Sequence, residues 1–331
     1  MLAASVALAL LASARSEPTI AEFPLPHSQS TPSDIVGGPD GNVWFTEEDI
    51  GDAIGKITPS GEITEFPLAL PASYPRGITV GPDGNIWFTE LVGKIGRLTL
   101  KGSTLPSGVI TEFPIPGAGV TEPIEIAAGA DGNLWFTEYY NRIGRMTTNG
   151  AVKLFTVPTP MSAPRFLTPG PDGNIWFTEF GSDQIGRIAP DGTFMEFSVP
   201  LQSGPFGITT GHDGNLWFVE ASANRIARMT TAGAVTEFPI PTPNSGGSEI
   251  AVGSDGTLWF TEMNANRVAQ VTLDGKITEF PVPTAGSGPY GIAGGPDRGV
   301  WFTEFLKGKV ARIAFGTEGR RVRVVNFRTP H

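Results

Sequence analysis

The chain lacks cysteine, has few charged residues and has no long apolar segment beyond its N-terminus. Its 331 residues include no cysteine, and charged residues make up 17 %. Without cysteine, a disulfide framework, a thiolate metal site and a thiol nucleophile are all excluded. The formal net charge of −10 argues against a nucleic-acid partner, which requires basic surface to neutralise phosphates. We therefore expect a monomeric protein with no nucleic-acid partner and no membrane span.

The N-terminus carries one short apolar run. Residues Leu2 to Ala14 are apolar or small, and Ala12-Ser13-Ala14 has the small-x-small pattern of a signal-peptidase site. The run is too short to cross a bilayer as a mature helix. It predicts a cleaved signal peptide over residues 1–16 and a secreted or periplasmic protein. The alternative is a disordered apolar leader, because the basic residues that usually begin a signal are missing.

The chain is rich in glycine and proline, with 43 and 30 residues, and its tryptophans are periodic. Each tryptophan lies in a copy of a motif of the type G-P-D-G-N-I-W-F-T-E. Successive tryptophans are 43, 48, 41, 41, 42 and 42 residues apart. A repeat of this length is typical of a four-stranded propeller blade, so we predict an all-β, seven-bladed β-propeller. The seven tryptophans are Trp44, Trp87, Trp135, Trp176, Trp217, Trp259 and Trp301.

Each repeat predicts four short antiparallel strands, as the second repeat illustrates. Gly77 to Val80 forms the first strand, and a Pro-Asp-Gly-Asn turn leads to Ile86 to Glu90. Asp-Gly between apolar runs is a strong hairpin signal because the turn requires positive φ. The third and fourth strands are Lys94 to Leu98 and Ile110 to Pro114. The proline that ends the fourth strand suits an outer edge, since proline cannot donate a ladder hydrogen bond.

One extra copy of the fourth strand, Ala21 to Pro24, precedes the first tryptophan motif. Pairing it with Lys309 to Ile313 would close the ring and remove the open strand edges. The segment Arg321 to Phe327 is the competing candidate, but its sequence does not match the repeat. We therefore predict a propeller over residues 17–316, closed by the N-terminal strand, followed by a C-terminal tail over residues 317–331.

The glutamate of W-F-T-E occurs in all seven repeats. A ring of seven carboxylates for a cation is one interpretation, but a single site requires asymmetry, so a structural role is favoured. Pairing Phe136 with Arg145 across the hairpin places Glu138 beside Arg145 on one face of the blade. The tryptophans likewise indicate packing between blades. The glutamates are Glu47, Glu90, Glu138, Glu179, Glu220, Glu262 and Glu304.

Function is expected where the repeats differ, at the start of each first strand, which lines the central channel near one mouth. A mixture of acids, arginines and aromatics there suits a polar small-molecule or peptide-like ligand, because charged residues inside a protein are costly unless paired or used. The alternative is that the two arginines only neutralise the acids in a water-filled channel. The candidate substrate-binding residues are Asp34, Arg76, Glu125, Arg165, Phe206, Ser248 and Glu249, with Tyr290 in the last repeat.

The repeat G-P-D-G-N-I-W-F-T-E, followed by I-G-R-I-T and by G-x-I-T-E-F-P-I-P, closely resembles the virginiamycin B lyase (streptogramin lyase) family from about Ile20 to Ile313. The resemblance implies a seven-bladed propeller that opens a cyclic depsipeptide antibiotic by elimination at an ester, and hence antibiotic resistance. It also implies a histidine base and a Mg²⁺ ion held by two glutamates.

Four positions of the family's site carry other residues in this chain. The family's last blade opens with E-P-H-G-I, and here that segment reads Gly288-Pro289-Tyr290-Gly291-Ile292. The resemblance therefore places Tyr290 at the position of the base and Gly288 at that of one metal ligand. Phe305 stands at the second metal position, and Ser248 replaces the substrate-binding histidine.

Three functions follow as alternatives. The first is a lyase-family enzyme with a rebuilt channel site, in which Tyr290 would act as the base. The second is a non-catalytic propeller that binds a ligand or a protein. The third is a sugar-lactone hydrolase, which requires at least three converging oxygen ligands for a metal.

Overall fold

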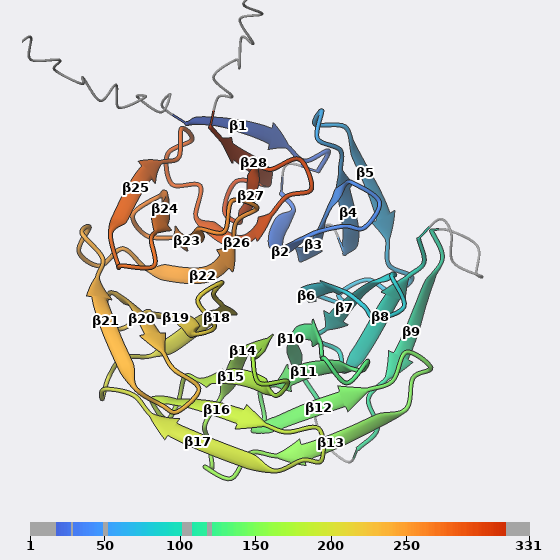
Figure 1. Cartoon of the computed structure of the whole chain (residues 1–331). Helices are drawn as coiled ribbons and strands as arrows, with labels where there is room; N and C mark the ends of the chain where they lie inside the picture. Colours follow the sequence, from blue (N-terminus) through green and yellow to red (C-terminus); the bar gives the residue numbers. More distant parts are fainter. Residues whose placement is uncertain (1–17, 28, 49–51, 101–107, 118–120, 316–331) are drawn as a thin grey trace, which may run out of the picture.

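The computed structural model describes residues 18–27, 29–48, 52–100, 108–117 and 121–315. The expected signal peptide and the expected C-terminal tail lie outside the described residues. Seven four-stranded antiparallel sheets form a ring around a central axis (Figure 1), and the described residues form no helix. We call the region along this axis, bounded by the innermost strands, the channel. The prediction of a seven-bladed β-propeller is confirmed. Within the same residues we find no helix with the length and hydropathy needed to cross a membrane.

The first strand of each blade lies next to the channel and contacts the first strands of both neighbouring blades. In every blade a β-bulge shifts its pairing with the second strand near its start. The first strands are β2 (Thr31–Gly37), β6 (Pro75–Val80), β10 (Pro123–Ala128), β14 (Pro164–Pro169), β18 (Pro205–Thr210), β22 (Gly247–Val252) and β26 (Pro289–Gly294).

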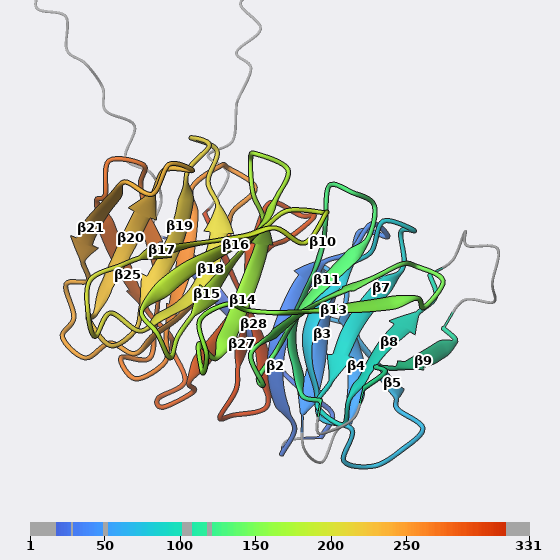
Figure 2. The same cartoon turned by 90° about the horizontal axis from the view of Figure 1, so that it is seen from below.

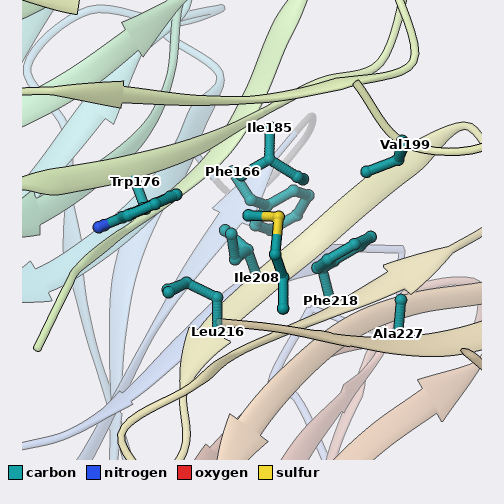
Figure 3. Close-up of a cluster of buried hydrophobic side chains, with 9 residues drawn as sticks. Phe166, Trp176, Ile185, Val199, Ile208, Leu216, Phe218 and Ala227 are labelled. Atoms are coloured by element: carbon teal, nitrogen blue, oxygen red, sulfur yellow. The ribbon is translucent and has the colours of Figure 1, made fainter. Parts of the chain in front are cut away.

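The second strands carry the tryptophan motif and are buried on both faces. Trp176 packs against Leu216 and Phe218 of the next blade (Figure 3), and its indole Nε1 donates to Asp172 in the preceding turn at 3.0 Å. The predicted inter-blade role of the tryptophans is confirmed. The second strands are β3 (Val43–Glu48), β7 (Ile86–Glu90), β11 (Leu134–Glu138), β15 (Ile175–Glu179), β19 (Leu216–Glu220), β23 (Leu258–Glu262) and β27 (Val300–Glu304).

The third strands show that the predicted hairpin register is wrong by one residue. Arg145 pairs with Trp135, and Gly144 pairs with Phe136. The guanidinium of Arg145 therefore lies over the Trp135 ring, at 5.7 Å, on the opposite face from Glu138. The third strands are β4 (Ala53–Ile57), β8 (Lys94–Leu98), β12 (Arg142–Met146), β16 (Gln184–Ile188), β20 (Arg225–Met229), β24 (Arg267–Val271) and β28 (Lys309–Ala314).

The fourth strands form the outer edge of the ring. The N-terminal strand β1 pairs with β28 in full register from Thr19 with Ala314 to Pro24 with Lys309, so it completes the last blade, as predicted (Figure 1). The fourth strands are β5 (Ile63–Pro67), β9 (Ile110–Pro114), β13 (Val152–Thr156), β17 (Phe194–Ser198), β21 (Val235–Pro239), β25 (Ile277–Pro281) and, in the last blade, β1 (Thr19–Pro24).

The seven glutamates of the repeat have a structural environment inside the blades. All have side chains with 0 % exposure, and in six blades the fourth strand supplies a second glutamate close by. Burial, together with the neighbouring Glu237, raises the pKa of Glu220 to about 8. The third blade has Leu154 in place of that second glutamate, and there Glu138 pairs with Arg142 at 2.5 Å. The glutamates are therefore components of the blade and do not ring the channel.

The loops of the disc gather on two faces (Figure 2). The start of each first strand pairs with the end of the second, as Pro123 does with Glu138. The loops that enter the first strands and those that follow the W-F-T-E segments therefore share one face, which we call the mouth face. The Asp-Gly turns between first and second strands lie on the opposite face.

Candidate functional site

Side chains from non-adjacent blades meet in the channel below the mouth face. Because a regular strand sends successive side chains to opposite sides, the β-bulge near the start of each first strand explains how two successive positions contribute. The predicted single ring is therefore two layers. The outer layer contains Arg76, Arg165, Phe206 and Tyr290, and the inner layer contains Asp34, Glu125 and Glu249.

Threonines of the repeat position the outer layer. The hydroxyl of Thr46 accepts a hydrogen bond from the backbone of Asp34 and donates to the carbonyl of Arg76 in the next blade, at 3.1 and 2.6 Å. Thr137 donates to the carbonyl of Arg165, at 2.6 Å, and Thr261 to that of Tyr290, at 2.6 Å. Each of these threonine hydrogen bonds links two neighbouring blades. A residue of the repeat therefore fixes the backbone of residues that differ from blade to blade.

The inner layer consists of three carboxylates from the first, third and sixth blades. Asp34 accepts hydrogen bonds from the backbone of Ile35 at 2.7 Å and of Ile78 at 2.8 Å. Glu249 accepts one from the backbone of Ile292 in the next blade, at 3.1 Å. These acids therefore tie neighbouring blades together through backbone donors.

Burial keeps the inner carboxylates partly protonated. It raises the pKa of Asp34 to about 6, while hydrogen bonds from the backbone of Ile78 and Ile35 act in the opposite direction. Burial and the charge of Asp34 raise the pKa of both Glu125 and Glu249 well above its ordinary value. Like charges in a buried site cannot all ionise, so the cluster holds protons at neutral pH.

In the outer layer, Arg76 bridges a phenol and a carboxylate. Its Nη2 donates to the Tyr290 hydroxyl at 3.4 Å, and its Nε lies 3.7 Å from Glu48 Oε1. Burial raises the pKa of Tyr290, although Arg76 acts against the shift. This direction favours the neutral phenol, which donates and accepts hydrogen bonds, over the phenolate that a general base requires.

Five aromatic rings form a continuous arc at the mouth. Phe206 contacts Phe166 with ring centroids 4.9 Å apart, Phe180 at 5.9 Å and Tyr290 at 6.5 Å. Tyr290 in turn contacts Phe305 at 5.7 Å. The arc runs from the fourth blade to the seventh and presents tilted and edge-to-face rings.

Arg165 lies at one end of this arc without an acidic partner. Its guanidinium is 4.9 Å from the Tyr139 ring and 5.8 Å from the Phe180 ring, and its Nε is buried without a hydrogen-bond partner. In the described part of the chain, no ion pair joins Arg76 or Arg165 to the inner carboxylates. Arg76 acts on Glu125 only through space, where it lowers the pKa. Direct pairing with the inner carboxylates therefore does not explain the two arginines.

Exposed apolar side chains concentrate on the mouth face. A hollow of about 380 Å³ between the third and fourth blades is lined by Tyr139, Tyr140, Asn141, Met161 and Ala163. Met161 is 85 % exposed. Further apolar side chains are exposed on mouth-face loops: Leu70, Tyr74, Val92, Phe180, Leu201 and Leu306.

The positions that the family resemblance assigns to a metal do not fit one. Gly288 has no side chain and a φ of 62°, and a Cβ there would lie 2.8 Å from Leu306. Phe305 offers only a ring, and the buried hydroxyl of Ser248 has no hydrogen-bond partner. Among the residues that the structure describes, no three His, Asp or Glu side chains are arranged to hold a metal ion.

The described histidines lie away from this site. His27 follows the outer strand β1, and its Nδ1 is 3.2 Å from Glu65 of the neighbouring outer strand β5. Its place in the repeat is that of Thr284, which bonds Glu22 in the same way. His212 lies in the turn between β18 and β19 on the opposite face. His331 lies outside the described residues.

Sequence reasoning missed several residues of the mouth. Glu48, Tyr139 and Phe180 each follow directly after a W-F-T-E segment, as Phe305 does. This position differs from blade to blade, which is the criterion that identified the first-strand candidates. Because second strands end where first strands begin, the same criterion predicts that these residues lie beside the channel.

Comparison with known proteins identifies close structural relatives. The family model described as "Virginiamycin B lyase family" matches residues 11–165 and 108–328. Virginiamycin B lyase from Staphylococcus aureus is 39 % identical, with a TM-score of 0.83 over 90 % of this chain and 99 % of that one. A catalytically inactive histidine-to-alanine variant of that enzyme, crystallised with quinupristin, is 37 % identical, with a TM-score of 0.83 and the same coverage.

A third relative, described as a streptogramin B lyase, is 38 % identical, with a TM-score of 0.84 over 90 % of this chain and 98 % of that one. A comparison with curated protein sequences found no match.

Proposed function

Because the chain belongs to the virginiamycin B lyase family, we propose that it binds a cyclic or peptide-like organic ligand at the mouth of its channel. We propose further that it does so without the family's metal-assisted elimination. The observation that carries the proposal is the arc of five rings, Phe166, Phe180, Phe206, Tyr290 and Phe305, next to two arginines.

The aromatic arc supplies contact area, and the outer layer supplies orientation. Ligand sites combine apolar and aromatic walls with a few fixed polar groups. Tyr290 and Arg76 are such groups, because Thr261 and Thr46 fix the backbone carbonyls of these two residues. Aromatic side chains also bury large areas at little cost in conformational entropy.

The residues at the positions of the family's base and metal ligands argue against elimination. A base must take a proton, but burial favours the neutral form of Tyr290. The metal positions, Gly288 and Phe305, offer no oxygen or nitrogen side-chain ligand. A relative that is catalytically inactive after loss of a histidine was nevertheless crystallised with quinupristin. Binding without turnover is therefore compatible with this scaffold.

The test is a calorimetric titration of the purified protein with quinupristin, with and without Mg²⁺, followed by mass spectrometry of the ligand. We expect saturable binding that Mg²⁺ leaves unchanged, and recovery of the intact ring. Phe206→Ala should weaken binding about tenfold, whereas Leu273→Ala, an exposed apolar residue on the opposite face, should not. Absence of saturable binding would sink the proposed binding function, and a ring-opened product would overturn the non-catalytic part.

Two enzymatic alternatives can be tested alongside the titration. If the channel held a rebuilt lyase site, Tyr290→Phe would abolish the ring opening of quinupristin. A lactone hydrolase would open a sugar lactone only with a divalent metal. The three inner carboxylates are its nearest candidate ligands, but they already accept backbone hydrogen bonds and hold protons. We expect neither turnover.

We also propose that the protein is exported, from the apolar run Leu2 to Ala14. Expression of the full chain should give a mature product that begins near Glu17. N-terminal sequencing of an uncleaved cytoplasmic product would contradict the proposal.

A further inference from the structure

The charges at the mouth are unevenly satisfied. Arg76 donates a hydrogen bond to the Tyr290 hydroxyl and forms an ion pair with Glu48. The side chain of Arg165, in contrast, makes neither an ion pair nor a hydrogen bond within the described residues. Burial, together with the like charge of Arg76, lowers the pKa of Arg165. Arg76 thus has Glu48 as an acidic partner, whereas no acid pairs with Arg165 in the described residues, so a ligand carboxylate could neutralise the Arg165 guanidinium.

The rings around Arg165 define which of its groups remain available. Tyr139 and Phe180 lie near the guanidinium, at 4.9 and 5.8 Å, in contacts that engage its π system. A guanidinium held this way retains N–H donors along its edge. Paired N–H donors match the geometry of a carboxylate, which they bind through two parallel hydrogen bonds.

An apolar compartment adjoins the charge. Tyr139 both stacks on Arg165 and lines the hollow of about 380 Å³, whose wall also includes Tyr140 and Met161. A volume in this range admits an aromatic ring or a comparable apolar group. The guanidinium and the hollow therefore both adjoin one tyrosine, Tyr139.

We propose that Arg165 binds a carboxylate of the ligand while the hollow beside Tyr139 takes an adjoining apolar or aromatic group. This rests on the proposed binding function and extends it to organic carboxylates. The shared chemistry includes both small aromatic acids and the C-terminal carboxylate of a peptide with an apolar last residue.

A matched pair of probes tests the inference. N-acetyl-phenylalanine carries the carboxylate, and N-acetyl-phenylalaninamide lacks only its charge. We expect the wild-type protein to bind the acid at least tenfold more tightly than the amide in calorimetric titrations at low ionic strength. Adding the corresponding dipeptide acid and a simple aryl-acetic acid distinguishes a peptide C-terminus from a small acid.

Variants locate the effect. Arg165→Gln should abolish the preference for the acid, and Arg165→Lys should retain part of it. Arg97→Gln is the control, because Arg97 also stacks on aromatic rings but lies away from the mouth over Trp87. Thermal unfolding of each variant verifies that it is folded.

Equal affinity for acid and amide, or a preference that survives Arg165→Gln, would overturn the inference. If quinupristin binds but neither probe does, the inference is wrong and the proposed function stands. If nothing binds, both are wrong.

Discussion

The two faces of the disc are built from the same seven repeats, but the tryptophan turn of the opposite face recurs in almost every blade, whereas the residues of the mouth face differ. On the opposite face, an aspartate of the turn accepts the indole hydrogen bond of the tryptophan in six blades. In the sixth blade Thr257 takes over this role. On the mouth face, equivalent positions hold Arg165, Phe206, Ser248 and Tyr290. Interactions that recur in every blade stabilise the ring, whereas those that occur once are available for recognition.

The difference between the two faces is tested most directly by truncating one repeated residue and one residue of the mouth that is not repeated. Trp217→Ala removes a fully buried side chain that joins two blades and should lower the free energy of unfolding by about 3–5 kcal/mol. Phe180→Ala, at the partly exposed mouth, should change it by less than about 1 kcal/mol. Chemical denaturation measures both, and equal losses would remove the distinction between the faces.

The third blade provides a test inside the repeated part. Its glutamate, Glu138, pairs with Arg142 because no second glutamate competes for the arginine. Arg142→Gln leaves a buried carboxyl group without its cation, and we expect a loss of about 2–3 kcal/mol at pH 8. The loss should shrink as the pH is lowered, because burial raises the pKa of Glu138 and Arg142 is the group that opposes this shift. Arg225→Gln is the control, since its partner Glu237 is more exposed; a similar loss there would contradict the explanation.

The paired glutamates predict that stability falls as pH rises. In the folded chain the pKa of Glu220 and of Glu262 is raised to about 8, from an ordinary value of 4.5. Between these values the folded state binds more protons than the unfolded state, so the stabilising contribution is complete below about pH 4.5 and is lost through about pH 8.

Replacement of either glutamate by glutamine should therefore remove about 1–2 kcal/mol of the loss between pH 5 and pH 8. Denaturation curves at three pH values measure this slope. At the acid limit the opposite applies, because hydrogen bonds lower the pKa of Asp131, Asp172 and Asp213. A slope that glutamine leaves unchanged would assign the pH dependence to other groups.

The repeat made most of the fold predictable, because the tryptophan spacing determines both the blade count and the strand positions. The predicted register at Arg145 was wrong because side-chain periodicity identifies a hairpin, whereas the conformation of its loop determines which residues pair. In that loop, Asn141 has a φ of 63°. The candidate site was predictable only in part. Sequence places Asp34, Glu125 and Glu249 near the channel, but only the curvature of the ring and the bulges bring them together.

The pairing of β1 with β28 has a consequence for biosynthesis. Thr19 and its partner Ala314 are 295 residues apart, which a ribosome covers in about 15–60 s. During that interval the first strand has no partner and the seventh blade cannot close, so the ring forms only after β28 has been synthesised. A circularly permuted gene that begins at Thr31 and places Thr19–Pro24 after Ala314 would build every blade from consecutive strands and would let the ring assemble progressively as the chain emerges.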